Sequence, residues 1–286
     1  MSVRIWLSVA SFLMTVVMAS GALAGGGGGD DLPRDTIGVV RGVGVSNPIW
    51  FLRSSNDGSC GNVTTALGFG GPSDQALTID ANGDGTDTMA VFRDEGGAGI
   101  FYIADTNTNG PSVTSEALGT GTDIPVSGNF DTTNDEDEVG VYRPSTNTFY
   151  LDEGLLAPFD LAFGAPGDIP VIGNWDGSAD GSDEVGLYRP STNTFYLRAD
   201  NLPGASGITV RTMGIPGDQP VVGDFDRDGT DTIGVYRAEA GGFGQAYLSN
   251  QTTGATVDIV IPFGDDEDDA VMGDWDGPLV DEAGCP

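Results

Sequence analysis

The chain has 286 residues, 43 of them acidic and 11 basic, and no histidine, so its formal net charge at pH 7 is −32. All the basic residues are arginines, so the composition excludes histidine-based catalysis, imidazole zinc sites, Schiff-base chemistry and a P-loop lysine. The negative charge also makes nucleic acid an unfavourable partner. The 46 glycines and the 38% apolar share favour a turn-rich β protein that has enough apolar residues for a core.

Residues 1–24 have the layout of a secretory signal peptide. Arg4 precedes an apolar run, Ile5 to Met18, and the triplet Ala22-Leu23-Ala24 offers a cleavage site. An uncleaved membrane anchor is the alternative, since about 20 residues could just span a bilayer. We expect cleavage after Ala24, a flexible glycine-rich leader over residues 25–34, no membrane span after cleavage, and a secreted protein that is extracellular or periplasmic.

From residue 35 to residue 286 the chain repeats one unit of about 49 residues five times. A tetrapeptide that ends in arginine recurs at spacings of 52, 50, 46 and 48 residues, and its arginines are Arg41, Arg93, Arg143, Arg189 and Arg237. Each is followed by an aromatic-rich run and two further apolar runs, separated by Gly, Pro, Asn and Asp. Four short runs with no helical period predict one blade of a β-propeller. We therefore predict an all-β propeller of about five four-stranded blades.

The two ends of the repeat region predict how the ring closes. Residues 35–41 correspond to the second strand of a unit and residues 270–277 to a first strand, so pairing of the N- and C-terminal strands completes one blade. An open solenoid is the alternative, but its terminal sheets would need caps. Cys60 and Cys285 are the only cysteines, and we expect a disulfide between them at this seam, with two free thiols as the alternative.

An acidic turn follows the fourth run of each unit and carries the strongest chemical signal. Two copies, residues 80–87 and 224–231, place oxygen-bearing side chains at positions 1, 3, 5 and 8, glycine at position 6 and a usable carbonyl at position 7. Carboxylates this close repel each other unless a divalent ion neutralises them, and Ca²⁺ suits the turn better than Mg²⁺ because it accepts six to eight oxygens. The candidate ligands are Asp80, Asn82, Asp84, Thr86 and Asp87, and Asp224, Asp226, Asp228, Thr230 and Asp231.

The other three turns match this spacing less closely. The turn from Asn129 has an insertion and no glycine at the bend, and the turn from Asn174 has two extra residues before its third candidate ligand. The turn from Asp274 breaks off into proline, so its remaining ligand would come from the N-terminal strand. Their candidate ligands are Asn129, Asp131, Asp135 and Asp137; Asn174, Asp176, Asp180 and Asp183; and Asp274, Asp276 and Asp281. We expect two to five calcium ions per chain; the alternative is that the acids merely solvate the turns.

The recurring pattern Gly-Asp-Phe/Trp-Asp-x-Asp-Gly-Thr-Asp-x-x-Gly-Val-Tyr-Arg resembles the FG-GAP/VCBS-type repeats of bacterial secreted proteins and, more distantly, of integrin α-chain propellers. The resemblance covers residues 35–286. It implies a β-propeller with calcium in blade hairpins and a role in adhesion, carbohydrate binding or surface targeting. The chain departs from the family at Thr88 and Thr232, where the ninth turn position is usually Asp, so Asp87 and Asp231 would have to substitute.

The recurring arginines have two interpretations. They could form a ring of guanidinium groups that faces a ligand. They could instead form forked pairs, either with the aspartates of the preceding Gly-Asp-x-Pro turns, Asp123, Asp168 and Asp218, or with a carboxylate of a metal-binding turn, and this structural interpretation is the one that we favour.

We expect a secreted, monomeric calcium-binding scaffold that binds an extracellular glycan, a cell-wall polymer or a protein and is not an enzyme. An exposed tryptophan could stack on a sugar, and the candidates are Trp50, Trp175 and Trp275. A glycoside hydrolase with paired carboxylates is the alternative, although each conspicuous acid cluster has a metal or turn explanation. A third interpretation is a purely structural ring whose acidity keeps it soluble.

Overall fold

The computed structural model describes residues 35–42, 47–53, 56, 65–131, 134–152, 159–178, 181–204, 207–239, 241–254 and 256–275. In these ranges the chain forms 20 β-strands, and none of them contains a helix that could cross a membrane. The expected signal peptide, the glycine-rich leader and both cysteines lie outside the described residues.

The strands form five four-stranded antiparallel sheets, which are the blades of the propeller. We give the strands of each blade in order from the innermost to the outermost. Blade 1 consists of β20 (Asp269–Gly273), β1 (Thr36–Arg41), β2 (Ile49–Leu52) and β3 (Thr65–Gly68). Blade 2 consists of β4 (Gln75–Ile79), β5 (Thr88–Glu95), β6 (Ala98–Ala104) and β7 (Val113–Thr120). Blade 3 consists of β8 (Ile124–Gly128), β9 (Glu138–Arg143), β10 (Thr148–Leu151) and β11 (Phe159–Ala162). Blade 4 consists of β12 (Ile169–Gly173), β13 (Glu184–Arg189), β14 (Thr194–Arg198) and β15 (Ile208–Thr212). Blade 5 consists of β16 (Gln219–Gly223), β17 (Thr232–Glu239), β18 (Phe243–Leu248) and β19 (Ile259–Pro262).

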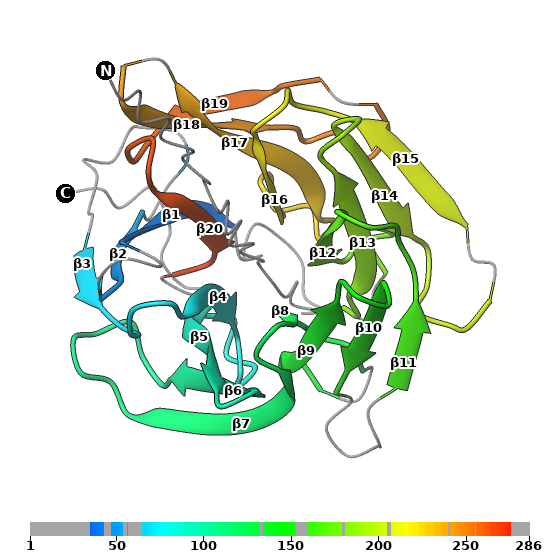
Figure 1. Cartoon of the computed structure of the whole chain (residues 1–286). Coiled ribbons are helices and arrows are strands. Elements are labelled where there is room, and N and C mark those ends of the chain that lie inside the picture. Colours follow the sequence, from blue (N-terminus) through cyan, green and yellow to red (C-terminus); the bar gives the residue numbers. More distant parts are fainter. Residues whose placement is uncertain are drawn as a thin grey trace, which may run out of the picture.

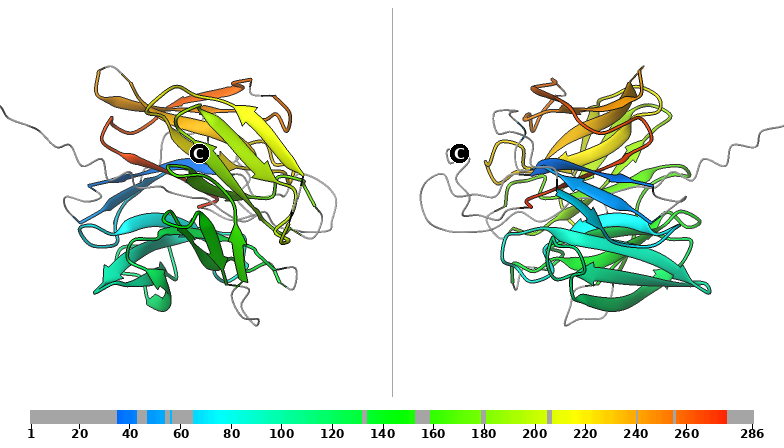
Figure 2. Two further views of the ribbon diagram at one scale, coloured as in Figure 1. Left: turned by 45° about the vertical axis from the view of Figure 1, so that its right-hand side comes forward. Right: turned by 90° about the vertical axis from the view of Figure 1, so that its left-hand side faces the viewer.

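The five blades are arranged around a central axis, which Figure 1 views end-on. The innermost strands contact one another in the cyclic order β20, β4, β8, β12, β16 and back to β20. Figure 2 shows from two further sides that each blade is a twisted sheet, as expected for antiparallel strands. The prediction of a five-bladed β-propeller is confirmed.

The ring closes where the two ends of the repeat region meet. β1 pairs antiparallel with β20 over five residue pairs, from Thr36 opposite Gly273 to Val40 opposite Asp269. Blade 1 therefore takes its innermost strand from the C-terminal part of the chain and its other three from the N-terminal part (Figure 1). This confirms closure by strand pairing over an open solenoid.

The core lies between the blades. The second strands are buried on both faces because each blade packs against two neighbours, and β13 has a buried Val185, Leu187 and Tyr188 in succession along one strand. One apolar cluster runs without a break from Val126 in blade 3 through blade 4 to Val235 in blade 5. Both faces of a blade are thus covered by other blades. Because each acidic turn begins directly after an innermost strand, the described parts of these turns lie at the same end of the blades.

Candidate metal sites in the acidic turns

The turn between β16 and β17 is built around Asp224. Its Oδ1 accepts hydrogen bonds from the backbone N–H groups of Asp226, Arg227 and Asp228 at 3.3, 2.7 and 3.2 Å, and its Oδ2 accepts one from Gly229 at 2.8 Å. The chain can wrap round the carboxylate because Arg227 and Gly229 adopt left-handed φ angles of 65° and 80°. The turn is therefore organised by its first aspartate.

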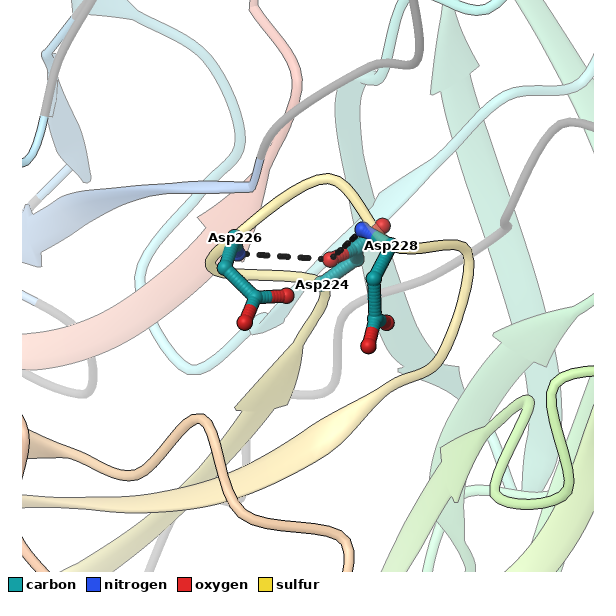
Figure 3. Close-up of side chains that lie close together, drawn as sticks. All are labelled: Asp224, Asp226 and Asp228. Atoms are coloured by element: carbon teal, nitrogen blue, oxygen red, sulfur yellow. Dashed lines mark hydrogen bonds between the residues drawn. The ribbon is translucent and has the colours of Figure 1, made fainter.

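The carboxylates of Asp224, Asp226 and Asp228 lie close together in this turn (Figure 3). One oxygen from each lies within 4.8 Å of the other two, and among the described residues no other trio of acids does this. Ca²⁺ binds oxygen at 2.3–2.6 Å, so ligands of one ion lie at most about 5 Å apart. Burial raises the pKa of Asp224 to about 6, while the N–H of Gly229 acts in the opposite direction. A cation here would offset the cost of keeping this buried group charged.

The turn at residues 80–87 has the same backbone conformation. Asp80 accepts hydrogen bonds from the N–H groups of Asp84 at 3.2 Å and Gly85 at 2.7 Å, and glycines 83 and 85 have φ angles of 66° and 80°. The side chains differ, because the amide nitrogen of Asn82 donates to Asp84 Oδ2 at 3.0 Å. This turn thus has the backbone of the first site, but one acid of the trio is replaced by an amide.

In both turns the backbone N–H of the seventh residue is hydrogen-bonded to the carboxylate of the fifth. The backbone N–H groups of Thr86 and Thr230 donate to Oδ1 of Asp84 at 3.0 Å and of Asp228 at 2.9 Å. These bonds orient the position-5 carboxylates toward their own turns.

The turn that begins at Asn174 is only partly described. Oδ1 of Asn174 and Oδ1 of Asp176 both accept the N–H of Ser178, at 3.1 and 2.8 Å, so the two side chains converge. The third candidate, Asp180, lies outside the described residues.

In each of the remaining two turns, the structure shows only one feature expected of a metal site. In the turn that begins at Asn129, the amide nitrogen of this residue donates to the carbonyl of Asn134 at 3.0 Å, while its buried Oδ1 has no hydrogen-bond partner. The structure does not place Asp131 and Asp135 in a trio of acids. In the last turn Asp274 is buried, and Asp276 and Asp281 lie outside the described residues.

The position-8 aspartates contact neighbouring blades. Oδ2 of Asp231 accepts the backbone N–H of Asn174 in blade 4 at 2.9 Å, and Oδ2 of Asp183 accepts that of Asn129 in blade 3 at 2.9 Å. Asp87 and Asp137 do the same. These four candidate ligands are therefore hydrogen-bonded to a neighbouring blade, and the structure does not place any of them in a trio of acids.

A fifth member of this set is Asp35, which the sequence analysis missed. It precedes β1 as Asp231 precedes β17, and its Oδ2 accepts the N–H of Asp224 at 2.8 Å. The signal was present in the sequence, since Asp-Thr-Ile-Gly occurs both at residues 35–38 and at residues 231–234.

The recurring arginines form forked ion pairs at the opposite end of the same strands. In each blade Nε and Nη2 contact the two oxygens of one buried aspartate at 2.7–3.0 Å. Each guanidinium also stacks on an aromatic ring, 4.4–5.0 Å from its centroid. The pairs are Arg41–Asp268, Arg93–Asp74, Arg143–Asp123, Arg189–Asp168 and Arg237–Asp218. The structural interpretation of the arginines is confirmed.

The tryptophans serve packing. Trp50 is fully buried and donates to the carbonyl of Phe69 at 3.0 Å, so its expected role in sugar stacking is wrong. Trp175 donates to the carbonyl of Glu184 at 3.0 Å, and both it and Trp275 are partly buried against core clusters.

A cavity of about 660 Å³ between blades 2 and 3 borders the acidic turn that begins at Asn129, and Asp131 and Asp137 of this turn line it. Glu116 on β7 and Asp152 after β10 line it and share a hydrogen bond between their carboxyl groups. Burial raises the pKa of Glu116 to about 7, and the contact with Asp152 adds to this. Sequence reasoning could not find the pair because its members are on different blades.

Comparison with known proteins adds no family. The chain matches no protein-family model and has no match among curated proteins. The structure defines a class by fold, the five-bladed β-propeller, and the resemblance to FG-GAP/VCBS-type repeats stays a prediction that rests on the turn residues.

Proposed function

We propose that this protein is a calcium-stabilised propeller that acts as a binding scaffold for an extracellular glycan, a cell-wall polymer or a protein. The observation that carries the proposal is the trio Asp224, Asp226 and Asp228, three acid side chains within ligand distance on a turn whose backbone is already ordered. A net charge of −32 adds a strong general attraction for cations.

The finer parts of the proposal rest on the sequence. The repetition of the turn supports two to five calcium ions, residues 1–24 support export, and the single cysteine pair supports a bridge between Cys60 and Cys285. We also propose a monomer without enzymatic activity, belonging with FG-GAP/VCBS-type repeat proteins.

Calcium removal and return test the metal site. After treatment with a chelator, added Ca²⁺ should raise the melting temperature, because a site at a hundredfold excess over its Kd contributes about 2.7 kcal/mol. Calorimetric titration of the same material gives the number of sites.

A paired variant assigns the effect to the turn. Asp226→Asn together with Asp228→Asn should lose part of the calcium-induced shift while the fold persists, since both side chains are exposed. Asp160→Asn, which removes an exposed charge on β11, is the control and should retain the whole shift. An equal shift in both proteins would remove this turn as a calcium site.

A scaffold differs from a purely structural ring in having a partner. Glycan-array binding or capture on cell-wall material, measured with and without calcium, should reveal a specific ligand. Uniform failure across glycans, cell-wall polymers and surface-protein preparations would favour the structural interpretation.

A second candidate function is hydrolysis of a glycoside. The cavity that holds Glu116 and Asp152 favours it, since a carboxyl with a pKa near 7 can act as a general acid at neutral pH. Turnover of chromogenic glycosides that Glu116→Gln abolishes and the exposed control Glu267→Gln preserves would favour this function over the scaffold.

A further inference from the structure

The dipeptide Asn82-Gly83, in the turn at residues 80–87, is one of two Asn-Gly sequences in the chain, and the other is Asn109-Gly110. Asparagine is most easily lost in this sequence, because glycine has no side chain to hinder attack by its backbone nitrogen on the asparagine amide. Both asparagines are exposed to water. Their hydrogen bonds differ, and this difference predicts which of the two amides reacts.

The amide of Asn82 is held close to the backbone nitrogen of Gly83. Its Oδ1 accepts the backbone N–H of Asp84 at 3.2 Å, and its Nδ2 donates to Asp84 Oδ2 at 3.0 Å. A hydrogen bond from the N–H two residues later folds an asparagine side chain back over the intervening peptide, so Cγ lies beside the nitrogen that must attack it. The N–H of Asp84 also stabilises the negative charge that develops on Oδ1 during this attack.

The nitrogen of Gly83 is weakly held. Its N–H donates to the carbonyl of Asp80 at 3.4 Å, which is longer than an ordinary hydrogen bond. A φ of 66° at this residue, and an added Cβ that would lie 3.1 Å from the carbonyl carbon of Asp135, both favour glycine here. The fold therefore keeps a reactive dipeptide in this turn.

Asn109 is restrained in a different way. Its Oδ1 accepts the N–H of Gly68 on β3 at 3.1 Å, so its amide is tied to the edge of blade 1. Closing a ring with the nitrogen of Gly110 draws the amide toward its own backbone and breaks this bond. The same dipeptide is thus prepared for reaction in one place and restrained in the other.

We propose that Asn82 is a site of spontaneous deamidation. The nitrogen of Gly83 gives its proton to solvent and forms a bond to Cγ of Asn82, and Nδ2 takes a proton from solvent and leaves as ammonia. The product of this step is a cyclic succinimide, which one water molecule then opens. Cleavage of the new bond from the nitrogen to Cγ leaves an aspartate at position 82, and cleavage of the original peptide bond leaves an isoaspartate.

The two products have opposite effects on the turn. Position 82 corresponds to Asp226, so an aspartate there gives this turn acids at positions 1, 3 and 5, as in the trio of the turn at residues 224–231. An isoaspartate lengthens the backbone before Gly83 and disturbs the hydrogen bonds from Asp84 and Gly85 to Asp80. The consequence for calcium rests on the proposed function, whereas the reaction itself does not.

The test follows both asparagines in the same full-length protein. The protein is incubated with a chelator at mildly alkaline pH and then digested, and mass spectrometry of the fragments measures the conversion of each amide to an acid. We expect Asn82 to react at least about fivefold faster than Asn109, because Asn109 must give up a hydrogen bond. In denaturant the two rates should be similar, since the dipeptide is the same. Asn82→Gln should stop conversion at this position, and the matched control Asn109→Gln should leave the rate at Asn82 unchanged.

A ratio of the two rates that is the same in the folded protein and in denaturant would overturn the proposal, because the fold would then not direct the reaction. Calcium titration of Asn82→Asp, which carries the aspartyl product from the start, separates this result from the proposed function. We expect this variant to bind Ca²⁺ more tightly than the unmodified chain. Fast conversion of Asn82 with no change of affinity in Asn82→Asp would support the reaction and contradict calcium binding in this turn, so the two proposals fail separately.

Discussion

At the scale of single residues, buried aspartates in this chain differ in what neutralises them. Asp168 has a side chain that is 1% exposed and is matched by Arg189, which contacts both of its oxygens at 2.7 Å. Asp183 is buried as deeply but accepts only a backbone N–H, and its pKa is raised by burial and then by the charge of Asp231. The first type of aspartate stabilises a blade internally, and the second is buried beside other acids with a backbone N–H as its hydrogen-bond donor.

The forked pair predicts a cost for the most conservative change. Arg189→Lys keeps the charge but loses one of two parallel hydrogen bonds to Asp168 and the planar stack on Tyr196, 4.6 Å away. We expect the free energy of unfolding to fall by about 1–2 kcal/mol. Urea unfolding at pH 7 measures it, and a midpoint equal to that of the unmodified protein would show that the fork is energetically unimportant.

Sequence reasoning at this scale succeeded for contacts within one blade. The arginine forks were predictable because arginine and aspartate recur at fixed positions on adjacent strands. The partner of Asp231 was not predictable from the spacing of its turn, because the N–H of Asn174 lies on another blade, 57 residues away. Asp35 was missed because it stands before the first complete turn, although its flanking residues repeat those of Asp231.

At the scale of the strand, the inner half of each blade was more predictable than the outer half. The second strands carry continuous buried residues, as in β13, because they are covered on both faces. The outermost strands are largely exposed, as in β7, so their apolar signal is weak and the sequence indicated only where they end. The acidic turns were readily located because each directly follows an innermost strand.

A glycine in a second strand permits close packing between strands. We therefore expect an added methyl group to destabilise the fold more there than on an outermost strand. A Cβ on Gly186 would lie 2.7 Å from Val171 Cγ2 and 2.9 Å from Leu197 Cδ2, so Gly186→Ala should destabilise the fold by about 1–3 kcal/mol. Gly68→Ala on the outer strand β3 is the control, since nothing lies within 4 Å of its added Cβ. Thermal unfolding of both variants tests this, and equal melting temperatures would contradict it.

At the scale of the whole molecule, the ring architecture concentrates negative charge at one end. The acidic turns and the five buried aspartates that precede the second strands lie where the innermost strands end, while the arginine forks lie at the opposite end. Packing the blades around an axis brings together acids that are far apart in sequence, and it joins Glu116 and Asp152 across blades 2 and 3 in the same way. Binding of a cation to these acids should therefore affect the stability of the whole fold.

That coupling predicts how pH acts with and without calcium. Burial raises the folded-state pKa of Glu116 to about 7 from 4.5, and of Asp231 to about 7 and Asp269 to about 6 from 3.8. Between the unfolded and folded values the native state binds more protons than the unfolded chain, so the free energy of unfolding falls as pH rises from about 4.5 to 7. In chelator, the melting temperature should accordingly decline from pH 5 to pH 8.

Saturating calcium should flatten part of this decline, because a cation bound by Asp224, whose pKa burial raises to about 6, stabilises the charged form of this carboxylate. The gap between the two melting curves should widen as pH rises, measured at matched ionic strength so that general screening cancels. Parallel curves with a constant gap would show that calcium binding is not coupled to the charge of Asp224. The difference in melting temperature with and without calcium should widen with pH in the unmodified chain and should be smaller in Asp226→Asn/Asp228→Asn. That result would assign the effect of calcium to the turn that contains Asp224, Asp226 and Asp228.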